Sequence, residues 1–457
     1  MKRTYPPAHC RSPSYSHSYS FSCSYSYSIP RRKHHPRPGI CTGFRLAACL
    51  AALCVLSPRA LAGTGASWPT FHGPNRDNIS AERGLLKTWP AGGPKLLWTF
   101  PACGKGYSNV AVAAGRLFTA GDFGDEEFVL AVDPNGRALW RSGNGKAWRG
   151  ASPGSRATPT WSDGLVYHLN PTGRLAAWRD ADGNEVWSVD LVERFGARRG
   201  TWALAESLAV DANVVLCLPC GRGGLMAGLD RKTGRTAWVC RYGDDRAAYC
   251  SPLLVTLDGR RAAVTLTAAA VVAVEVRTGK LLWRQEHAAP HGQNATTPVV
   301  AGGCVFVAGG HSRGGTLFRI ATDERGGLPR LWHRKDLDNC HGGAVLLDGR
   351  LYTSGCRLGG KDFFCVDWLT GKDIARSAAI GKVAVSCADG RLYCLNERGR
   401  MTLLEPTAEG FRTAGQFDLP RGDGACFAHP VVCGGRLYAR WGRNLYCYDI
   451  RDGGAGP

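Results

Sequence analysis

Residues 273–283 of this 457-residue chain read AVEVRTGKLLW. Val and Leu are typical of a pleated, half-buried surface, and a glycine at a turn supplies the positive φ that other residues resist. The stretch therefore predicts one strand, a tight turn that contains Thr278 and Gly279, and a second strand that ends at Trp283.

The same pattern occurs elsewhere in the chain. A tryptophan lies four residues after a glycine, at spacings of 45 to 51 residues, in the pairs Gly136 and Trp140, Gly183 and Trp187, Gly234 and Trp238, and Gly279 and Trp283. A pattern that returns at a nearly constant period of this length indicates a repeat architecture.

A second repeating element gives the number of units. Turns of the Asp-Gly or Gly-Gly kind between alternating apolar runs are a strong hairpin signal. Six turns of this kind lie at residues 163–164, 258–259, 302–303, 348–349, 389–390 and 434–435, and related turns, Ala-Gly and Ala-Asn, lie at residues 114–115 and 212–213. The eight turns are 41 to 49 residues apart. Each unit therefore has four short strands, which is the content of one propeller blade.

The two ends of the chain complement each other. The last unit stops shortly after Gly453, before its fourth strand, whereas the KLLW of residues 95–98 is identical to residues 280–283 and belongs to no unit. We therefore expect an all-β fold over one domain, residues 66–453. It is an eight-bladed β-propeller of four-stranded antiparallel blades, with the ring closed by the N-terminal strand completing the last blade.

The tryptophans are expected to have a structural role because they share one position in several units. We expect each indole to pack on the neighbouring blade, with its N–H donating to a backbone carbonyl. This docking set comprises Trp98, Trp140, Trp187, Trp238 and Trp283. Units six and seven lack the tryptophan, and unit five has only a displaced Trp332.

The first 62 residues are expected to be a low-complexity leader and signal peptide. Residues 12–26 are rich in Ser and Tyr, residues 46–56 are apolar, and Ala60 and Ala62 supply the small residues of a cleavage site. We expect an exported protein, periplasmic or extracellular, with no transmembrane segment after the signal is removed. Leu46-Ala47-Ala48-Cys49 superficially matches a lipoprotein box but follows Arg45 without an apolar run.

The net charge of +20 includes nine Lys and Arg in the leader, which has no acid, so +11 remains for the rest of the chain. These cations are scattered over turns, which disfavours a nucleic-acid partner. Fourteen of the 19 cysteines follow the leader, in apolar strand contexts that indicate packing or an incidental disulfide.

No metal site is expected. Cys217 and Cys220 have no second pair to complete a zinc site, and the segment from Asp180 to Glu185 resembles a calcium loop whose twelfth position is Leu191, which cannot coordinate. His287 and His291 have the spacing of a helical pair, but Pro290 and Gly292 disfavour the helix.

The Gly-x-x-x-Trp repeats resemble those of the PQQ-like, quinoprotein-type β-propellers over nearly the whole chain after the leader. This family includes quinone-dependent alcohol and sugar dehydrogenases and the propeller subunit of the outer-membrane β-barrel assembly machinery. In the dehydrogenases, the resemblance implies a vicinal Cys-Cys disulfide, a calcium ion and a catalytic Asp. This sequence has no adjacent Cys-Cys pair. The resemblance therefore indicates the fold, and function has to be argued from the site.

Candidate site residues lie where the first strand of each blade begins, because that end lies beside the channel and its residues differ between units. By register, this ligand-binding rim comprises Tyr107, Asn109, Arg156, Glu206, Tyr249, Asn294, His341 and His429. Such side chains could bind a small polar molecule, a glycan or a peptide, or could simply solvate the channel mouth.

We expect an exported, monomeric propeller that acts as a non-catalytic binding or scaffolding module in the cell envelope. Its expected partner is a protein, a small polar ligand or a glycan, and we expect no catalytic residue and no cofactor. One alternative is an oxidoreductase that uses PQQ with calcium. A third possibility is a propeller that binds or processes glycans. The quinone reading predicts a bound chromophore and dye reduction, whereas the glycan reading predicts binding to a glycan array.

Overall fold

The computed structural model describes residues 66–320, 327–357 and 361–453. The chain separates into two units, Met1–Leu61 and Ala62–Pro457, and all of these residues belong to the second. The expected leader and its cleavage site lie outside the described residues. Nearly all regular structure in the described part is β-strand.

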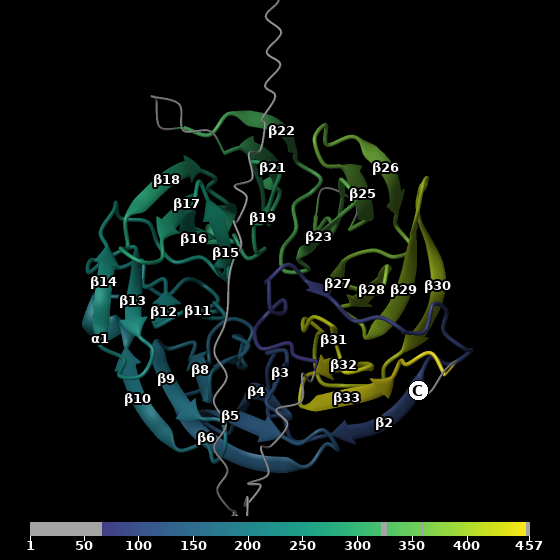
Figure 1. The fold of residues 1–457 in the computed structure, drawn as a ribbon, viewed down its shortest axis with the longest axis horizontal. Coiled ribbons are helices and arrows are strands. Elements are labelled where there is room, and N and C mark those ends of the chain that lie inside the picture. Colours follow the sequence, from purple (N-terminus) through teal and green to yellow (C-terminus); the bar gives the residue numbers. More distant parts are fainter. Residues whose placement is uncertain (1–65, 321–326, 358–360, 454–457) are drawn as a thin grey trace, which may run out of the picture. The chain divides into compact units, whose positions relative to one another are not determined.

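The strands form eight sheets arranged as the blades of a propeller around a central channel (Figure 1). The first four blades along the chain consist of β3 (Ala111–Ala113), β4 (Arg116–Phe123), β5 (Glu126–Val132) and β6 (Ala138–Lys146); β7 (Thr160–Ser162), β8 (Leu165–Leu169), β9 (Arg174–Arg179) and β10 (Glu185–Asp190); β11 (Ala209–Asp211), β12 (Val214–Cys217), β13 (Met226–Asp230) and β14 (Thr236–Cys240); and β15 (Leu253–Leu257), β16 (Arg260–Leu266), β17 (Ala270–Glu275) and β18 (Leu281–Glu286).

The next three blades consist of β19 (Val299–Ala301), β20 (Cys304–Gly309), β21 (Gly314–Arg319) and β22 (Arg330–Arg334); β23 (Ala344–Leu347), β24 (Arg350–Ser354), β25 (Phe363–Asp367) and β26 (Asp373–Ser377); and β27 (Val383–Ala388), β28 (Arg391–Asn396), β29 (Arg400–Thr407) and β30 (Gly410–Asp418). Within each blade, consecutive strands pair antiparallel, as the hairpin pattern predicts.

The eighth blade combines the two ends of the described chain. Its inner strands are β31 (Val431–Cys433), β32 (Arg436–Trp441) and β33 (Asn444–Asp449), and its outer strand is β2 (Lys95–Phe100). Strand β2 pairs antiparallel with β33, with Lys95 opposite Asp449 and Phe100 opposite Leu445. Figure 1 shows this pair at the edge of the ring, beside the next blade.

The first hairpin of each blade has a two-residue turn at the predicted place. In the fourth blade, Asp258 and Gly259 have φ of 46° and 75°, the left-handed values of a turn that matches the twist of paired strands.

Each blade buries both faces of its inner strands: Val271, Val272, Ala273 and Val274 on β17 are all inaccessible to solvent. The core is therefore a series of apolar layers between adjacent blades.

The tryptophans of the outer strands join each blade to the next. The indole Nε1 of Trp140 donates to the carbonyl of Asp180 at 2.9 Å, and Trp98 and Trp187 make the equivalent bonds to Pro134 and Arg231. A Cβ built on Gly183 would lie 2.6 Å from the indole of Trp140. The turn of the following blade therefore needs a glycine at the position that packs on this indole.

Three docking positions depart from the expected pattern. The indole N–H groups of Trp238 and Trp283 have no hydrogen-bond partner among the described residues, although Trp238 lies against Gly279 in the same way. Trp332 is displaced only in sequence: its Nε1 donates to the carbonyl of Trp368 at 2.9 Å and its ring lies against Gly371.

The helices of the described part are short. Helix α1 (Leu191–Phe195) follows β10, and its amides at Val192 and Glu193 donate to the side chain of Asp190. A 3₁₀ turn, η1, spans Pro290–Gly292. Among the described residues, neither helix has the length and hydrophobicity needed to cross a bilayer.

Candidate functional site

The segments that lead into the first strand of each blade converge on one cavity at a mouth of the channel. Its volume is about 380 Å³, within the range of roughly 300–1,000 Å³ typical of small-ligand sites. All eight blades contribute to its lining, which consists of Phe71, Tyr107, Asn109, Ser152, Arg156, Trp202, Ala205, Ser207, Tyr249, Ser251, Gln293, Ala295, His311, Cys340, His341, Cys356, Arg357, Lys382, Phe427 and His429. We call it the mouth cavity.

The structure brings six of the eight predicted rim residues together in this lining: Tyr107, Asn109, Arg156, Tyr249, His341 and His429. Glu206 and Asn294 do not line the cavity. Each lies between two residues that do, Ala205 and Ser207 in one case and Gln293 and Ala295 in the other. Successive side chains of an extended segment point to opposite sides, so a register error of one residue selects the wrong side.

Glu206 and Asn294 instead have buried structural surroundings. Glu206 Oε1 accepts a hydrogen bond from the amide of Leu218 at 2.8 Å, and burial raises the pKa of Glu206 to about 8. The side-chain amide of Asn294 donates to the carbonyls of Thr267 and His287, both at 2.8 Å. Both residues therefore stabilise segments behind the cavity wall.

Two of the three histidines that line the mouth cavity, His341 and His429, are joined by a hydrogen bond and form part of its wall. The amide of His429 donates to Asn109 Oδ1 at 2.8 Å, and His429 Nε2 lies 2.7 Å from the carbonyl oxygen of His341. Burial lowers the pKa of His429 to about 4 and that of His341 well below its ordinary value. Both rings are therefore neutral at pH 7 and act as hydrogen-bonding and packing groups.

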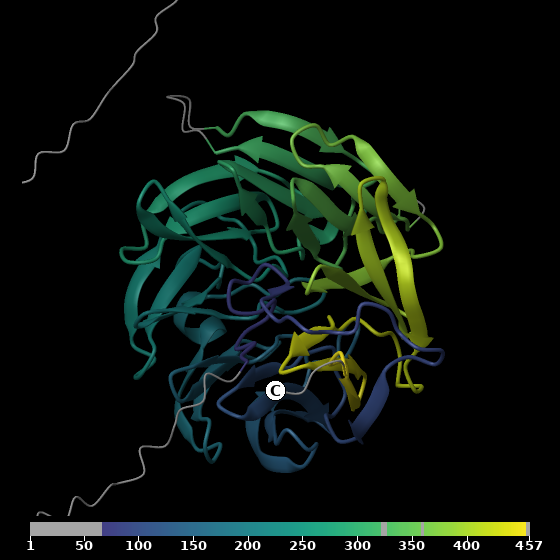
Figure 2. The same cartoon turned by 45° about the vertical axis from the view of Figure 1, so that its right-hand side comes forward.

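The N-terminal segment forms the floor of the mouth cavity. It crosses the middle of the ring and then pairs with the seventh blade through β1 (Ile79–Ser80), which lies parallel to β27 (Figures 1 and 2). Phe71 faces the mouth cavity, whereas His72 and residues 75–79 line a second cavity of about 270 Å³. We call residues 68–80 the plug because they separate the two cavities.

Arg76 holds the plug in place. Its side chain is 3% exposed, and its guanidinium donates to the carbonyls of Leu208 at 2.9 Å and Ser207 at 2.7 Å. It also contacts the hydroxyl of Thr70. Burial lowers the pKa of Arg76 to about 10, so it remains a cation at pH 7. The plug is thus tied to the third blade by a buried charge bonded to neutral acceptors.

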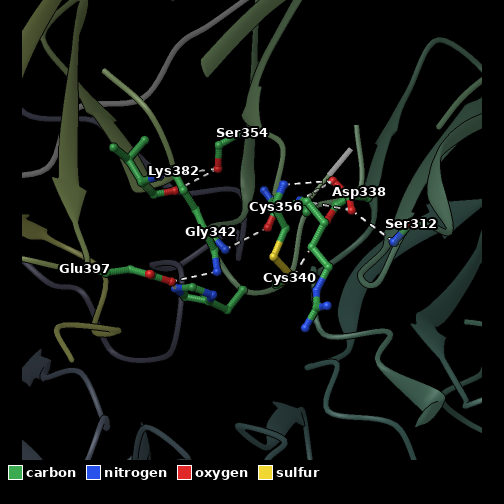
Figure 3. The surroundings of a disulfide bond; sticks show 12 residues. Ser312, Asp338, Cys340, Gly342, Ser354, Cys356, Lys382 and Glu397 are labelled. Carbon is green, nitrogen blue, oxygen red and sulfur yellow. Dashed lines mark hydrogen bonds and ion pairs between the residues drawn. A yellow bond between two sulfur atoms is a disulfide. The ribbon is translucent and has the colours of Figure 1, made fainter. Parts of the chain in front are cut away.

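Three cations line the mouth cavity, and none of its lining residues is Asp or Glu. Arg156 is held by backbone carbonyls: its guanidinium donates to Ala151, Ser152 and Gly154 at 2.5 to 2.8 Å. The ammonium of Lys382 lies 2.6 Å from Glu397, which also lies 3.6 Å from His341 (Figure 3). The third cation is Arg357.

A disulfide between Cys340 and Cys356 forms another part of the wall. It connects the segment before β23 to the loop after β24. The carboxylate of Asp338 accepts hydrogen bonds from the amides of Ser312 at 3.0 Å and Cys356 at 2.8 Å (Figure 3). The other twelve cysteines of the described part are free and buried, among them Cys217 and Cys220.

Several cavity residues were not singled out from the sequence. Lys382 directly precedes β27 and occupies the rim position of the seventh blade, for which the predicted set names no residue. Trp202 is one of eight tryptophans outside the docking positions, so its place in the sequence does not single it out. Arg357 and Phe71 reach the cavity from a loop and from the plug, which the repeat register does not cover.

The lining does not fit the calcium-dependent quinone chemistry of the dehydrogenases. A calcium ion needs oxygen ligands, mainly carboxylates, whereas the lining of this cavity offers no carboxylate, and its disulfide joins residues 16 apart. Across the described residues, no group of three His, Cys, Asp or Glu side chains is placed to hold a metal. His287 is buried, whereas His291 lies on η1 with its ring 5.1 Å from that of His311.

Comparison with solved structures shows the propeller fold. BamB from Moraxella catarrhalis matches with a TM-score of 0.55 and 14% identity, over 78% of this chain and 100% of that chain. Quinohemoprotein alcohol dehydrogenase ADHIIG from Pseudomonas putida HK5 matches with a TM-score of 0.62 and 13% identity, over 85% of this chain and 81% of that chain. The corresponding enzyme from Comamonas testosteroni has a TM-score of 0.58 and 14% identity over the same shares.

No curated protein sequence matches the chain. The family model described as outer membrane protein assembly factor BamB matches residues 125–377, which is more than half of the 457 residues. The chain therefore belongs to the outer membrane protein assembly factor BamB family of PQQ-like propellers.

Proposed function

We propose that this protein is an exported, non-catalytic propeller of the cell envelope that binds a small polar ligand in the mouth cavity. The observation that carries the proposal is the convergence of non-repeating side chains from all eight blades on one cavity. A repeat fold reuses the same residues where their role is structural, so variety confined to one mouth favours a ligand-facing surface. The envelope location rests on the family description, which names the outer membrane.

A protein partner is the second candidate. It is favoured by the family description as an assembly factor. In this case the rim would contact a segment of the partner, and the mouth cavity would receive one of its side chains. Both candidates describe a propeller without a chemical step.

The test is a thermal-shift screen of the purified protein against small polar compounds. Trp202→Ala is the mouth variant, and Arg277→Gln is the control, since Arg277 lies exposed on the turn between β17 and β18, at the other end of the strands. We expect compounds that raise Tm in the wild type and the control but not in the mouth variant. Equal shifts in all three, or no shift with any compound, would refute the proposal.

A parallel assay addresses catalysis. The protein is mixed with PQQ and calcium, and reduction of an artificial electron acceptor is followed with alcohols and sugars as substrates. The proposal expects no dye reduction above the protein-free control. Turnover that Trp202→Ala abolishes would favour the oxidoreductase reading instead.

A further inference from the structure

The charge around the mouth cavity is unbalanced. Arg156 and Arg357 line it, and neither forms an ion pair with a carboxylate among the described residues, whereas the charge of Lys382 is matched by Glu397. The acids that act electrostatically on Arg156 are Asp122 and Glu127, which do not line the cavity. Burial raises the pKa of Glu127 to about 8, so Glu127 is mostly uncharged at pH 7, whereas Asp122, with its pKa raised to about 6, keeps most of its negative charge. Arg357 therefore leaves the cavity positive where a ligand would sit.

Arg357 is positioned by its neighbours, and its side chain has no hydrogen-bond or ion-pair partner among the described residues. Asp338 accepts a hydrogen bond from its backbone amide at 3.1 Å, and the adjacent disulfide fixes Cys356 to the segment that carries His341 (Figure 3). Its guanidinium forms no hydrogen bond within the described part of the chain, and the residue is exposed. An exposed guanidinium whose N–H groups are free can bind a carboxylate or a phosphate through two parallel hydrogen bonds.

Partly exposed aromatic rings lie on two sides of the same cavity. Phe427 contacts Tyr107 and His341, with ring centroids 5.2 Å and 4.7 Å away. Trp202 packs edge-to-face on Tyr249 at 5.6 Å and lies 5.9 Å from His311. Such rings present flat apolar faces that suit the C–H face of a sugar ring.

The remaining lining is polar and neutral. Asn109, Ser152, Ser207, Ser251 and Gln293 provide amide and hydroxyl groups. Such groups can donate hydrogen bonds to, and accept them from, the hydroxyls of a bound molecule. Neutral polar groups, aromatic faces and guanidiniums without an ion-pair partner among the described residues therefore occur in one cavity.

We infer that the mouth cavity binds an anionic sugar, whose carboxylate or phosphate pairs with Arg357 and Arg156, whose ring packs on the aromatic side chains and whose hydroxyls bond to the neutral polar side chains of the lining. This inference rests on the proposed function and specifies its ligand. Uronates and sugar phosphates share the required chemistry, and the titrations below distinguish them.

The experiment is isothermal titration of the purified protein with glucuronate, glucose 6-phosphate, glucose and inorganic phosphate. We expect at least one anionic sugar to bind about tenfold or more tightly than glucose, because a charge-assisted hydrogen bond contributes more than a neutral one. Arg357→Gln should weaken that binding by about tenfold to a hundredfold, and higher salt should weaken it further in the wild type. Arg277→Gln is the matched control and should bind as the wild type does.

The outcomes separate this inference from the proposed function. If glucose binds as tightly as the anionic sugars, or if Arg357→Gln leaves their affinity unchanged, the inference is wrong while a binding cavity remains. The same holds if the anionic sugars do not bind but other compounds give Trp202-dependent thermal shifts. Binding of inorganic phosphate alone also overturns the inference. Because Arg357 is exposed, its variant should retain the wild-type Tm, and a folded variant with lost affinity supports the assignment.

Discussion

Gly279→Ala tests whether the docking of a tryptophan on a glycine stabilises the propeller. Gly279 has φ of 74°, and a Cβ built on it would lie 2.4 Å from Trp238. Gly259, in the first turn of the same blade, has φ of 75° with no atom within 4 Å of its Cβ position. The two positions share the backbone conformation and differ in the contact, so Gly259→Ala is a matched control.

The expected magnitudes follow from two separate costs. A left-handed conformation costs an L-residue about 1–2 kcal/mol, and this applies to both variants. Inserting a methyl group into a packed contact costs a further 1–3 kcal/mol or so, and this applies to Gly279→Ala alone. The gain from restricting the unfolded chain is the same for both and cancels in the comparison. We expect Gly279→Ala to be less stable than Gly259→Ala by about 1–3 kcal/mol.

The assay is equilibrium unfolding in guanidinium chloride, with the m-value checked for each variant. A second pair of measurements places both changes on the background of Trp238→Ala, which removes the ring that the new methyl group meets. The difference between the two alanine variants should then disappear, as a double-mutant cycle requires for a direct contact. Equal losses on the wild-type background, within about 0.5 kcal/mol, would refute a stabilising role for the docking contact.

Three further predictions concern the plug, a buried acid and the disulfide. Arg76→Met should lower the free energy of unfolding by about 2–4 kcal/mol, because the carbonyls of Ser207 and Leu208 lose their donors. It should also speed proteolysis of residues 66–80. Arg83 is exposed, so Arg83→Met is the control, and equal effects of the two substitutions would contradict this prediction. Burial raises the pKa of Glu206 from 4.5 to about 8. The contribution of the protonated Glu206 side chain to the free energy of unfolding is therefore fully present below the pKa of Glu206 in the unfolded chain, and it is lost as pH rises toward 8. Tm should therefore fall less between pH 5 and pH 8 in Glu206→Gln than in the wild type, and parallel profiles would argue against this. Replacing Cys340 and Cys356 by Ser opens a loop with a sequence separation of 16 and should cost about 3 kcal/mol; unchanged chemical unfolding under oxidising conditions would show that the bond adds no stability.

Much of the candidate site could be predicted from the repeat, because the repeat places the start of each first strand beside the channel. Six of eight rim residues line the mouth cavity for this reason. The errors at Glu206 and Asn294 are errors of one residue, and in an extended segment one residue reverses the side that a side chain faces. Lys382 could have been found by applying the same register to the seventh blade.

Other features of the site could not be predicted from the register of the repeat. Phe71 and Arg76 belong to a segment before the first complete blade, and only its path across the channel brings them to the cavities. The bond between Cys340 and Cys356 is one of many pairings open to fourteen cysteines, and it depends on how close two loops of the sixth blade come.

The amino-acid sequence alone determined the number of blades, the strand order within each blade and the two-residue turns. These features are local: each depends on an apolar alternation and on a glycine or aspartate a few residues away, and the pattern repeats often enough to be recognised. The tertiary structure decided which side chains share the mouth cavity and what charge they leave unpaired. Those properties depend on distances between residues hundreds of positions apart, such as Asn109 and His429, and no local pattern encodes them.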